Sequence, residues 1–396
     1  MEFVLTYILN IQKKEVITVS RLKSFDNILL GHIEKGEMAG ASYIAARGGE
    51  ILFENCVGFS DIAAGKKLEF DTVMRLASMT KPLTGAAVLK ARELGLLGLG
   101  DSVSKYIPEF SSLSVAEFDC HGNITGTHPA GSEIYIRDLL NHTSGIGMSA
   151  ATQKIFGSAF PGITLADLVP KYASVPLDFE PRSASAYSAT MSFDVACRIV
   201  EIVSGMEYEA FLKKHILSPL GMCDTAYALS PLQEKRLAVM YHSENGRLAP
   251  SRPDQLILSN VTPTFKAGGT QLFSTILDYS RFAAMLCGGG EYGGVRILSP
   301  ESVKLMASPS LPEALRGKGC EEWGLSVRVI TRKDPPNQVL NAGAFGWSGA
   351  YETHFFIDPG LSLYAVLFKN VTSGLGAGAV TSREFEREVM NAVEGC

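Results

Sequence analysis

Strand-like patterns of apolar and polar residues gather near the two ends of the chain. Residues 40–54 hold two strand-like runs joined by Arg-Gly-Gly, which predicts a β-hairpin. Comparable runs reappear only at 323–330, 350–357 and 361–368, and an Asp-Pro-Gly turn at 358–360 separates the last two. We therefore expect the two ends of the chain to share one antiparallel sheet.

Between these strands the pattern is mostly helical. Apolar residues recur with a helical period in six segments: 136–140, 165–172, 191–204, 208–216, 274–286 and 299–307. An amphipathic helix is expected over 19–35, before the first hairpin. A closing helix is expected over 382–393, because Phe385, Val389 and Val393 recur every fourth residue and would pack back on the sheet.

These patterns predict an α+β fold, with an antiparallel sheet built from N- and C-terminal strands, flanked by helices, and a mostly helical inserted domain. We expect residues 1–96 and 260–396 to form the sheet domain and residues 97–259 to form the insertion. The length of 396 residues is compatible with two or three domains, or with one large composite domain.

Composition narrows the class of protein. The chain is 46% hydrophobic, carries 19% charged residues and has a net charge of −5, so nothing electrostatic favours a nucleic-acid partner. The first ten residues are apolar but carry Glu2 in place of a basic start and lack a small-residue cleavage site, so no signal peptide is expected. No run reaches about 18 uninterrupted apolar residues, so no membrane span is expected either.

The seven cysteines are scattered and include no Cys-x-x-Cys pair, which favours free thiols and a cytoplasmic location. Cys120, His121 and His128 suggest a metal site, but residues 122–127 between them have the composition of a turn and a fourth ligand is not evident. We expect a loop there and neither a metal nor another cofactor.

The candidate chemistry begins with Ser78 and Lys81, three residues apart at the start of a predicted helix. At this spacing both side chains lie on one helix face, so the amine can reach the hydroxyl as a base reaches a nucleophile. Two other Ser-x-x-Lys pairs begin at Ser20 and Ser102, in a charged amphipathic stretch and on a polar turn. Only the Ser78 pair opens an apolar, alanine-rich helix, which ends at Gly95.

Two later stretches offer partners for this pair. Tyr187 stands between small residues just before a predicted helix, where its hydroxyl would be accessible, although a tyrosine of the core fits equally. Trp347, Ser348 and Gly349 precede a predicted strand, although a tryptophan there also fits simple core packing.

This order of motifs, Ser-x-x-Lys, then Tyr, then Trp-x-Gly before a C-terminal strand, resembles the penicillin-binding and class C β-lactamase superfamily, and within it most closely the family VIII carboxylesterases. Further stretches agree with the resemblance, which covers roughly residues 20–395. They are the Leu-Leu-Asn-His-Thr-Ser-Gly run at 139–145, the Leu-Gly-Met run at 220–222 with Asp224 and Thr225, and the run at 268–275 with Asp278, Arg281 and Phe282.

The resemblance implies roles for single residues. Ser78 would be the acylated nucleophile, and Lys81 and Tyr187 its proton-transfer pair. Lys81 acts as a base only if its pKa is depressed, and alternatively Lys81 stays charged while Tyr187 is a phenolate. The backbone N–H groups of Ser78 and Ala350 would form the oxyanion hole, and Gly349 would let the strand approach the substrate closely.

Two departures from the lactamase pattern favour an ester substrate. Trp347 replaces the lysine that holds the substrate carboxylate in β-lactamases, and Ala189 replaces an asparagine. Without that cation and amide, the site should bind anionic β-lactams poorly, whereas an indole wall suits an uncharged group. We therefore expect Trp347, Ser348 and Gly349 to bind a small carboxylic ester.

Several alternatives remain beside this hypothesis. A β-lactamase, a D-aminopeptidase-like amidase and an acyltransferase belong to the same superfamily, and a catalytically silent binding module would keep the pocket without turnover. Ser348 and His354 imitate the serine and histidine of an α/β-hydrolase, but Ala350 stands where the second glycine of that motif should be. His142 and Ser144 imitate a catalytic pair too, although their segment is typical of a helix end with a Gly145 cap.

Overall fold

An eight-stranded sheet is the largest element of the computed structural model, which describes residues 24–147, 162–244, 247–252, 256, 264–317, 319–335, 338–372 and 380–394. Its strand order is β12-β13-β14-β15-β16-β1-β2-β3, and every neighbouring pair is antiparallel. The strands span Gly40–Arg47 (β1), Glu50–Asp61 (β2), Lys66–Lys67 (β3), Glu321–Trp323 (β12), Arg328–Ile330 (β13), Phe345–Ser348 (β14), His354–Asp358 (β15) and Leu363–Lys369 (β16). The predicted α+β fold, with both ends of the chain in one sheet, is confirmed.

The pairing of β1 with β16 joins the two ends of the chain, and the β1–β2 hairpin stands where the sequence predicts it. Gly48 and Gly49 connect the hairpin with φ of 61° and 86°. Positive φ at both central residues is the geometry of the two-residue turn that matches strand twist, and glycine adopts it without strain.

Two strand predictions need correction. The segment 323–330 is not one strand, because Ser326 has a φ of 71° and the backbone turns between β12 and β13. The expected strand at 350–357 begins only at His354, and the preceding strand β14 already contains Trp347 and Ser348. Hence these two residues lie on a strand, not before one.

The helices follow their predicted positions closely. They span Thr80–Glu93 (α2), Ile136–Leu140 (α3), Leu165–Tyr172 (α5), Met191–Ser204 (α6), Tyr208–Leu212 (α7), Pro231–Glu234 (α8), Ile276–Cys287 (α9), Pro300–Met306 (α10) and Val380–Glu394 (α11). A further helix covers 24–34, and the rest of its predicted span, 19–23, lies outside the described residues. A π-helical turn at Lys213–Leu217 replaces the end of the predicted 208–216 helix. Short 3₁₀ helices occupy Ala77–Met79, Val103–Lys105, Pro108–Ser111, Glu313–Leu315 and Pro359–Leu361.

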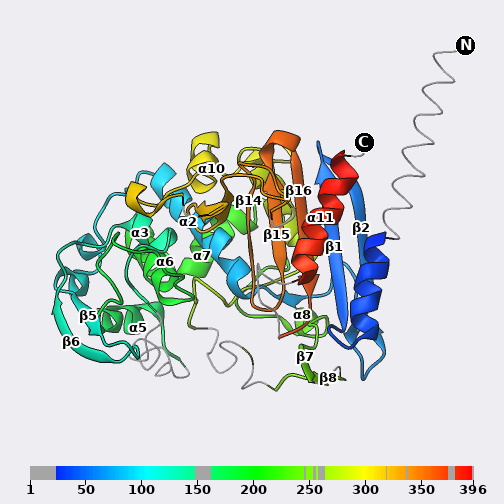
Figure 1. The fold of residues 1–396 in the computed structure, drawn as a ribbon, viewed down its shortest axis with the longest axis horizontal. Helices are drawn as coiled ribbons and strands as arrows, with labels where there is room; N and C mark the ends of the chain where they lie inside the picture. The colour runs from blue at the N-terminus through cyan, green and yellow to red at the C-terminus, as the bar shows by residue number, and fades with distance from the viewer. Residues whose placement is uncertain are drawn as a thin grey trace, which may run out of the picture.

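Helices cover both faces of the sheet (Figure 1). On one face, Phe25 and Leu29 of the 24–34 helix pack with Phe385 and Val389 of α11 against side chains of β1 and β16. On the other face lie α2 and α9, whose apolar residues join the larger core. The expected packing of the closing helix on the sheet is therefore confirmed.

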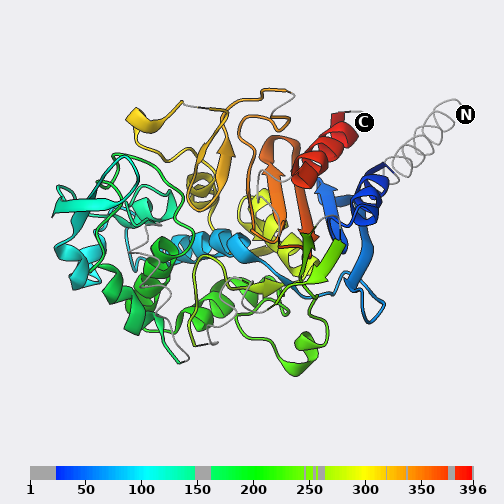
Figure 2. The same ribbon diagram turned by 60° about the horizontal axis from the view of Figure 1, so that its bottom comes forward.

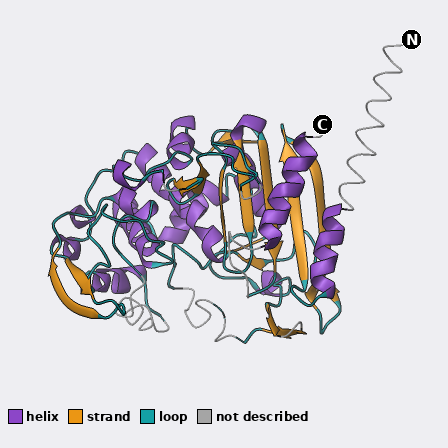
Figure 3. Ribbon diagram, in the orientation of Figure 1, coloured by secondary structure: helices purple, strands orange, loops and turns teal. Residues whose placement is uncertain are grey.

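The larger core continues from the sheet through α2 into the helices α3, α5, α6 and α7. Figure 3 shows these helices gathered beside the sheet, and Figure 2 shows α2 running between the two regions. The division into a sheet domain and an inserted domain stays a prediction, since one apolar cluster joins the regions.

The region that we predicted as mostly helical also contains two small β-hairpins among the described residues. They pair Ser114–Phe118 (β5) with Ile124–Pro129 (β6), and Tyr241–Glu244 (β7) with Arg247–Pro250 (β8). Further two-stranded pairs join Met74–Arg75 (β4) with Phe273–Ser274 (β9), and Glu291–Tyr292 (β10) with Val295–Arg296 (β11). The predicted turn at 122–127 is wrong from Ile124 onward, because that part forms β6.

Candidate active site

Ser78 lies on the 3₁₀ turn between β4 and α2, at the boundary of the sheet and the helical region. Its side chain is 9% exposed. Ala77, directly before it, has a φ of 46°, a left-handed conformation that costs energy for any residue with a Cβ. Leu76 N–H donates to Leu272 O at 2.9 Å and the Tyr279 hydroxyl donates to Met79 O at 2.9 Å, so the surroundings hold this strained turn.

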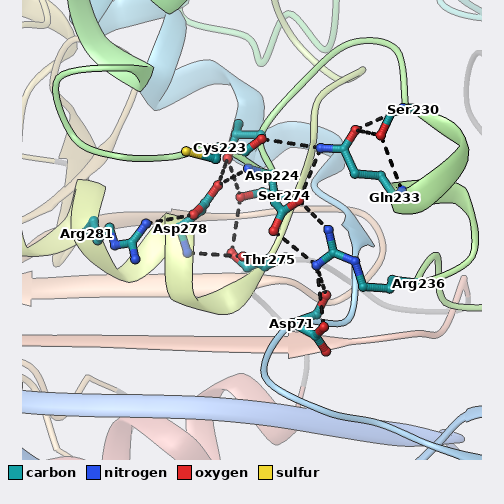
Figure 4. A network of polar contacts seen from close by, with 11 residues as sticks. Asp71, Cys223, Asp224, Ser230, Gln233, Arg236, Ser274, Thr275, Asp278 and Arg281 are labelled. Carbon is teal, nitrogen blue, oxygen red and sulfur yellow. Dashed lines mark hydrogen bonds and ion pairs between the residues drawn. The ribbon is translucent and has the colours of Figure 1, made fainter.

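A network of charged and hydroxyl side chains supports the strand that leads into this turn (Figure 4). Asp278 accepts hydrogen bonds from the Asp224 N–H at 2.7 Å and the Thr225 hydroxyl at 3.1 Å. Arg236 joins the Asp224 carboxylate to the Asp71 carbonyl, just before β4. The contacts of Asp224 and Thr225 with Asp278 thus help to fix β4 against β9.

Lys81 is fully buried on the first turn of α2. Its Nζ donates to Ala189 O at 2.6 Å and to Gly269 O at 2.9 Å, and it lies 3.2 Å from Ser78 Oγ. Burial lowers the pKa of Lys81, and the nearby Tyr187 opposes that shift only in part. A neutral amine would be satisfied here, because its two N–H groups meet two carbonyls and its lone pair faces the serine hydroxyl.

Tyr187 brings the third side chain to the same oxygen from the loop before α6. Its hydroxyl lies 2.7 Å from Ser78 Oγ, and the Lys81 Nζ lies 4.9 Å from its ring centroid. The structure therefore brings Ser78, Lys81 and Tyr187 together around one oxygen atom, as the sequence predicts. The arrangement suits removal of the serine proton and its return to a leaving group.

The turn after β14 reaches the Ser78 turn from the other side. Gly349 N–H donates to Thr353 O at 2.7 Å, and the Thr353 hydroxyl donates to Leu76 O at 3.0 Å. A Cβ on Gly349 would collide with both Leu76 O and Thr353 Oγ1, so only glycine permits this approach. Ala350 packs in one small apolar cluster with Ala77, the residue before Ser78, and its role in an oxyanion hole stays a prediction.

Trp347 and Ser348 point to opposite faces of β14. Trp347 packs toward Tyr187 and Trp323, with ring centroids 5.4 Å and 4.7 Å away. Ser348 Oγ instead lies 2.7 Å from His354 Nδ1 on the face that α11 covers. The predicted substrate-binding role thus gains support for the Trp347 side chain, whereas the Ser348 hydroxyl is already occupied.

A pocket of about 380 Å³ is lined in part by the two tryptophans, Trp323 and Trp347. Its wall combines apolar and charged side chains: Ser185, Leu311, Leu315, Gly319, Glu321, Glu322, Trp323, Arg328 and Trp347. This volume falls within the range of small-molecule sites. The pocket could hold the part of a substrate that projects beyond the reacting carbonyl.

His142 lies under the site without contacting the reacting groups through hydrogen bonds. Its ring centroid is 4.9 Å from that of Tyr187, and its Nδ1 accepts the Ser188 N–H at 3.1 Å. Burial, followed by the charge of Lys81, holds the pKa of His142 well below its usual value. His142 also carries the positive φ, 62°, directly after the end of α3, so the left-handed cap residue is this histidine and not Gly145.

Two contributors escaped the sequence analysis. Trp323 appeared there only as part of a strand, although it is one of only two tryptophans in the chain. Asp194 lies buried on α6, where it accepts the Gly268 N–H at 2.9 Å. Burial raises the pKa of Asp194 to about 7. A carboxylate on the apolar face of a predicted helix is the signal that could have revealed it.

The metal hypothesis finds no support in the hairpin that carries its residues. Cys120, His121 and His128 are all exposed on or beside β5 and β6. Within the described ranges, no group of three or more His, Cys, Asp or Glu side chains is placed to hold a metal ion. For the same ranges, no helix is both long and apolar enough to cross a membrane.

Comparison with known proteins identifies the family of this chain. A family model described as Beta-lactamase matches residues 25–384. Protein Rv1367c of Mycobacterium tuberculosis is 34% identical over 351 residues, which cover 83% of this chain and 85% of that protein. Esterase EstB of Burkholderia gladioli is 30% identical over 375 residues, which cover 88% of this chain and 90% of that protein.

A solved structure extends the comparison to the fold. EstCE1, described as a hydrolase with promiscuous acyltransferase activity, superposes with a TM-score of 0.77 over 95% of this chain and 98% of its own, at 22% identity. The recognition of the superfamily from the order of its motifs is confirmed. The chain belongs to the beta-lactamase family, which is part of a superfamily of serine hydrolases that includes esterases.

Proposed function

We propose that this protein hydrolyses small carboxylic esters through an acyl-enzyme on Ser78. The observation that carries the proposal is the position of Ser78 Oγ, 3.2 Å from the Lys81 amine and 2.7 Å from the Tyr187 hydroxyl. A buried amine with a lowered pKa and a phenol at the same oxygen form a proton-transfer pair.

The reaction would follow from this geometry in two halves. The Lys81 and Tyr187 pair takes the Ser78 proton while Oγ attacks the ester carbonyl, and the backbone N–H groups of Ser78 and Ala350 stabilise the resulting oxyanion. Collapse of the tetrahedral intermediate breaks the ester bond, and the alcohol leaves with the proton. Water then attacks the acyl-enzyme and gives a proton to the same pair, which returns it to Ser78 Oγ as the carboxylic acid leaves.

The walls of the site support an ester in preference to a β-lactam. Trp347 stands where β-lactamases carry a lysine for the substrate carboxylate, and the ring of Trp323 packs beside it. Ala189 contributes its carbonyl to Lys81 and offers no side-chain amide. An anionic substrate would therefore lose its charge partner, whereas an uncharged acyl or alkyl group would bury apolar area.

The compartment is part of the same proposal. Six of the seven cysteines lie in the described part of the chain, and all six are free thiols. Free thiols persist in reducing compartments, which supports a cytoplasmic location. The proposed partner is thus a small uncharged ester inside the cell.

Hydrolysis of p-nitrophenyl butyrate by the wild-type protein and by Ser78→Ala tests the proposal. We expect S78A to lose at least about 10⁴-fold in kcat with an unchanged melting temperature. A fluorophosphonate probe should label the wild-type protein and leave S78A unlabelled. Retention of activity or of labelling by S78A would overturn the assignment.

Acyl transfer is the second candidate, because EstCE1 combines hydrolase and acyltransferase activities in the same fold. Adding a primary alcohol to the assay separates the two. A transferase forms the new ester at the expense of the acid, whereas a hydrolase releases mainly acid. Nitrocefin and a D-amino-acid amide in the same panel test the lactamase and amidase alternatives.

A further inference from the structure

A second serine has a hydrogen-bonded histidine, with an acid close to the other nitrogen of that histidine, on the face of the sheet opposite Trp347. Ser348 of β14 and His354 of β15 are direct cross-strand partners, with Ser348 Oγ 2.7 Å from His354 Nδ1. His354 Nε2 lies 3.2 Å from Glu386 Oε1 on α11. These side chains are almost completely excluded from solvent, with Ser348 3% exposed and the other two 0%.

The charges around His354 determine which of its nitrogens carries a proton. Glu386 accepts from Arg328 Nη2 at 2.6 Å, and Arg383 of α11 lies 3.3 Å from its other oxygen. Burial would raise the pKa of Glu386, but the charge of Arg328 and the contact with His354 reverse that effect and lower it to about 2. Glu386 is therefore a carboxylate at neutral pH, and its oxygen 3.2 Å from His354 Nε2 favours a proton on that nitrogen.

Burial lowers the pKa of His354 and outweighs the opposing pull of Glu386. The positive charges of Arg328 and Lys369 lower it further. The imidazole is thus neutral, with its proton on Nε2, and its Nδ1 is an acceptor for the Ser348 hydroxyl. Donation therefore runs from Ser348 on β14 to His354, and the N–H of His354 faces Glu386 on α11.

The pair stands at the base of the turn that carries Ala350. Residues 349–353 connect β14 to β15, and Ser348 and His354 are the last paired residues before the turn. The same turn is tied to the Ser78 turn by the hydrogen bond from the Thr353 hydroxyl to Leu76 O. Cross-strand side-chain contacts of this kind stabilise a hairpin at its loop end.

Ser348 is not a second nucleophile in this arrangement. Its hydroxyl is enclosed between β15 and α11, whereas Trp347 on the opposite face lines the pocket. A nucleophile needs a space where a carbonyl carbon can approach it, with donors aimed at the developing oxyanion. The serine, histidine and glutamate can therefore act only on the position of the backbone.

We propose that His354 is a positioning residue, whose anchored neutral imidazole accepts the Ser348 hydroxyl and thereby holds the Ala350 N–H in place as an oxyanion donor. The proposal rests on the function proposed above, in which that N–H stabilises the intermediate. Loosening the turn would displace a donor whose value depends on its alignment with the oxyanion, and would leave ground-state binding unchanged.

Ser348→Ala is the direct test, because it removes the hydrogen bond at the smallest cost in volume. We expect kcat/KM for p-nitrophenyl butyrate to fall about ten- to a hundred-fold, and the affinity for phenylboronic acid to fall by a similar factor. The boronic acid forms a tetrahedral adduct with a reactive serine and places an oxygen in the oxyanion hole. Inhibition by butyrate, a ground-state product, should stay unchanged.

Three further variants make the test specific. Ser302→Ala is the matched control, since Ser302 is also buried but lies on α10, away from the turn. Ser348→Thr keeps a hydroxyl and should retain activity. His354→Asn removes the imidazole and should impair boronate binding as S348A does, and the double variant S348A/H354N should be no worse than the more damaged single one.

The outcomes separate this proposal from the proposed function. A folded S348A with wild-type kcat/KM and wild-type boronate affinity overturns the positioning role, and so does an equal loss of boronate and butyrate affinity. If S348A does not fold, H354N is judged by the same two affinities. A wild-type protein that neither hydrolyses the ester nor reacts with a fluorophosphonate overturns the proposed function instead.

Discussion

Two serines in the described part of the chain each have a basic side chain at hydrogen-bond distance, and their surroundings differ. Ser78 shares its oxygen with Lys81 and Tyr187 at the meeting point of the helical region and the sheet, beside the turn that brings Ala350. Ser348 has the more familiar partners, a histidine and a glutamate, but it is sealed beneath α11.

The comparison shows that a chain of hydrogen bonds does not define an active site. The proposed site at Ser78 combines a serine hydroxyl, an amine with a lowered pKa and a nearby pocket. The group at Ser348 offers only a buried serine hydroxyl and a basic side chain. Its charges, Arg328 and Glu386, are paired with one another and are typical of a buried structural network.

Removing the Tyr187 hydroxyl, which lies beside Ser78 Oγ, should lower activity more than the other variants described below. We expect Tyr187→Phe to lower kcat for p-nitrophenyl butyrate about 10²- to 10⁴-fold, because the proton-transfer pair loses one member. Tyr43→Phe is the matched control, since its hydroxyl bonds Asp26 at 2.7 Å on the far face of the sheet. A Y187F enzyme within ten-fold of the wild type would remove Tyr187 from the proposed mechanism.

Breaking the ionic network beneath Ser348 should lower stability more than it lowers activity. We expect Glu386→Gln to reduce the free energy of unfolding by about 3 kcal/mol or more, because Arg328 keeps its charge in a buried site. Glu301→Gln is the surface control, since the pair of Glu301 with Arg92 is largely exposed and should contribute less than about 1 kcal/mol. Urea denaturation at neutral pH measures both.

The same residue predicts an acid limit to stability. Folding lowers the pKa of Glu386 from its ordinary 4.5 to about 2, so its contribution is complete above the ordinary value and is lost as the pH falls toward 2. Wild-type stability should therefore decline between about pH 4.5 and about pH 2, and E386Q should decline less over that window. Equal slopes for the two proteins would contradict the assigned role of Glu386.

The sequence could predict what depends on local spacing. Ser78 and Lys81 meet because they are three residues apart, on the 3₁₀ turn and the first turn of α2 that follows it. Likewise, α5 begins at its predicted residue because Thr164 and Asp167 cap each other. The contact of Tyr187 with Ser78 spans 109 positions, and no spacing rule predicts it. Resemblance to a family supplied that partner.

The elements and residues that the sequence did not predict also depend on the local pattern or on distant contacts. The β5–β6 hairpin is exposed on most of β6 and therefore lacks the apolar alternation that reveals a strand. The start of β14 was missed because Gly346 and Trp347 lack a simple alternating pattern, and without that strand the opposite directions of Trp347 and Ser348 could not be deduced. Burial of Asp194 depends on α6 packing against neighbours that lie elsewhere in the sequence.

Asp194 allows a test of how its charge affects the pKa of Lys81 beside Ser78, and the expected effect is the smallest of those described. Burial lowers the pKa of Lys81, whereas Tyr187 and Asp194 raise it. Asp194 ionises at a pKa of about 7, raised by burial, so its charge appears in the range where many hydrolases work. Removing that charge should let Lys81 lose its proton at a lower pH, because less negative potential holds the ammonium form.

Asp194→Asn removes the charge and keeps an oxygen for the Gly268 N–H, whose loop supplies the Gly269 carbonyl to Lys81. If neutral Lys81 is the base, kcat/KM rises with pH as the amine deprotonates, and D194N should move this acid limb down by about one pH unit. Profiles of kcat/KM from about pH 5 to about pH 9 measure the shift. If D194N leaves the acid limb of the kcat/KM profile unmoved or raises it, neutral Lys81 is not the base. The base would then be the Tyr187 phenolate, because among the described residues Tyr187 is the other group at hydrogen-bond distance from Ser78 Oγ.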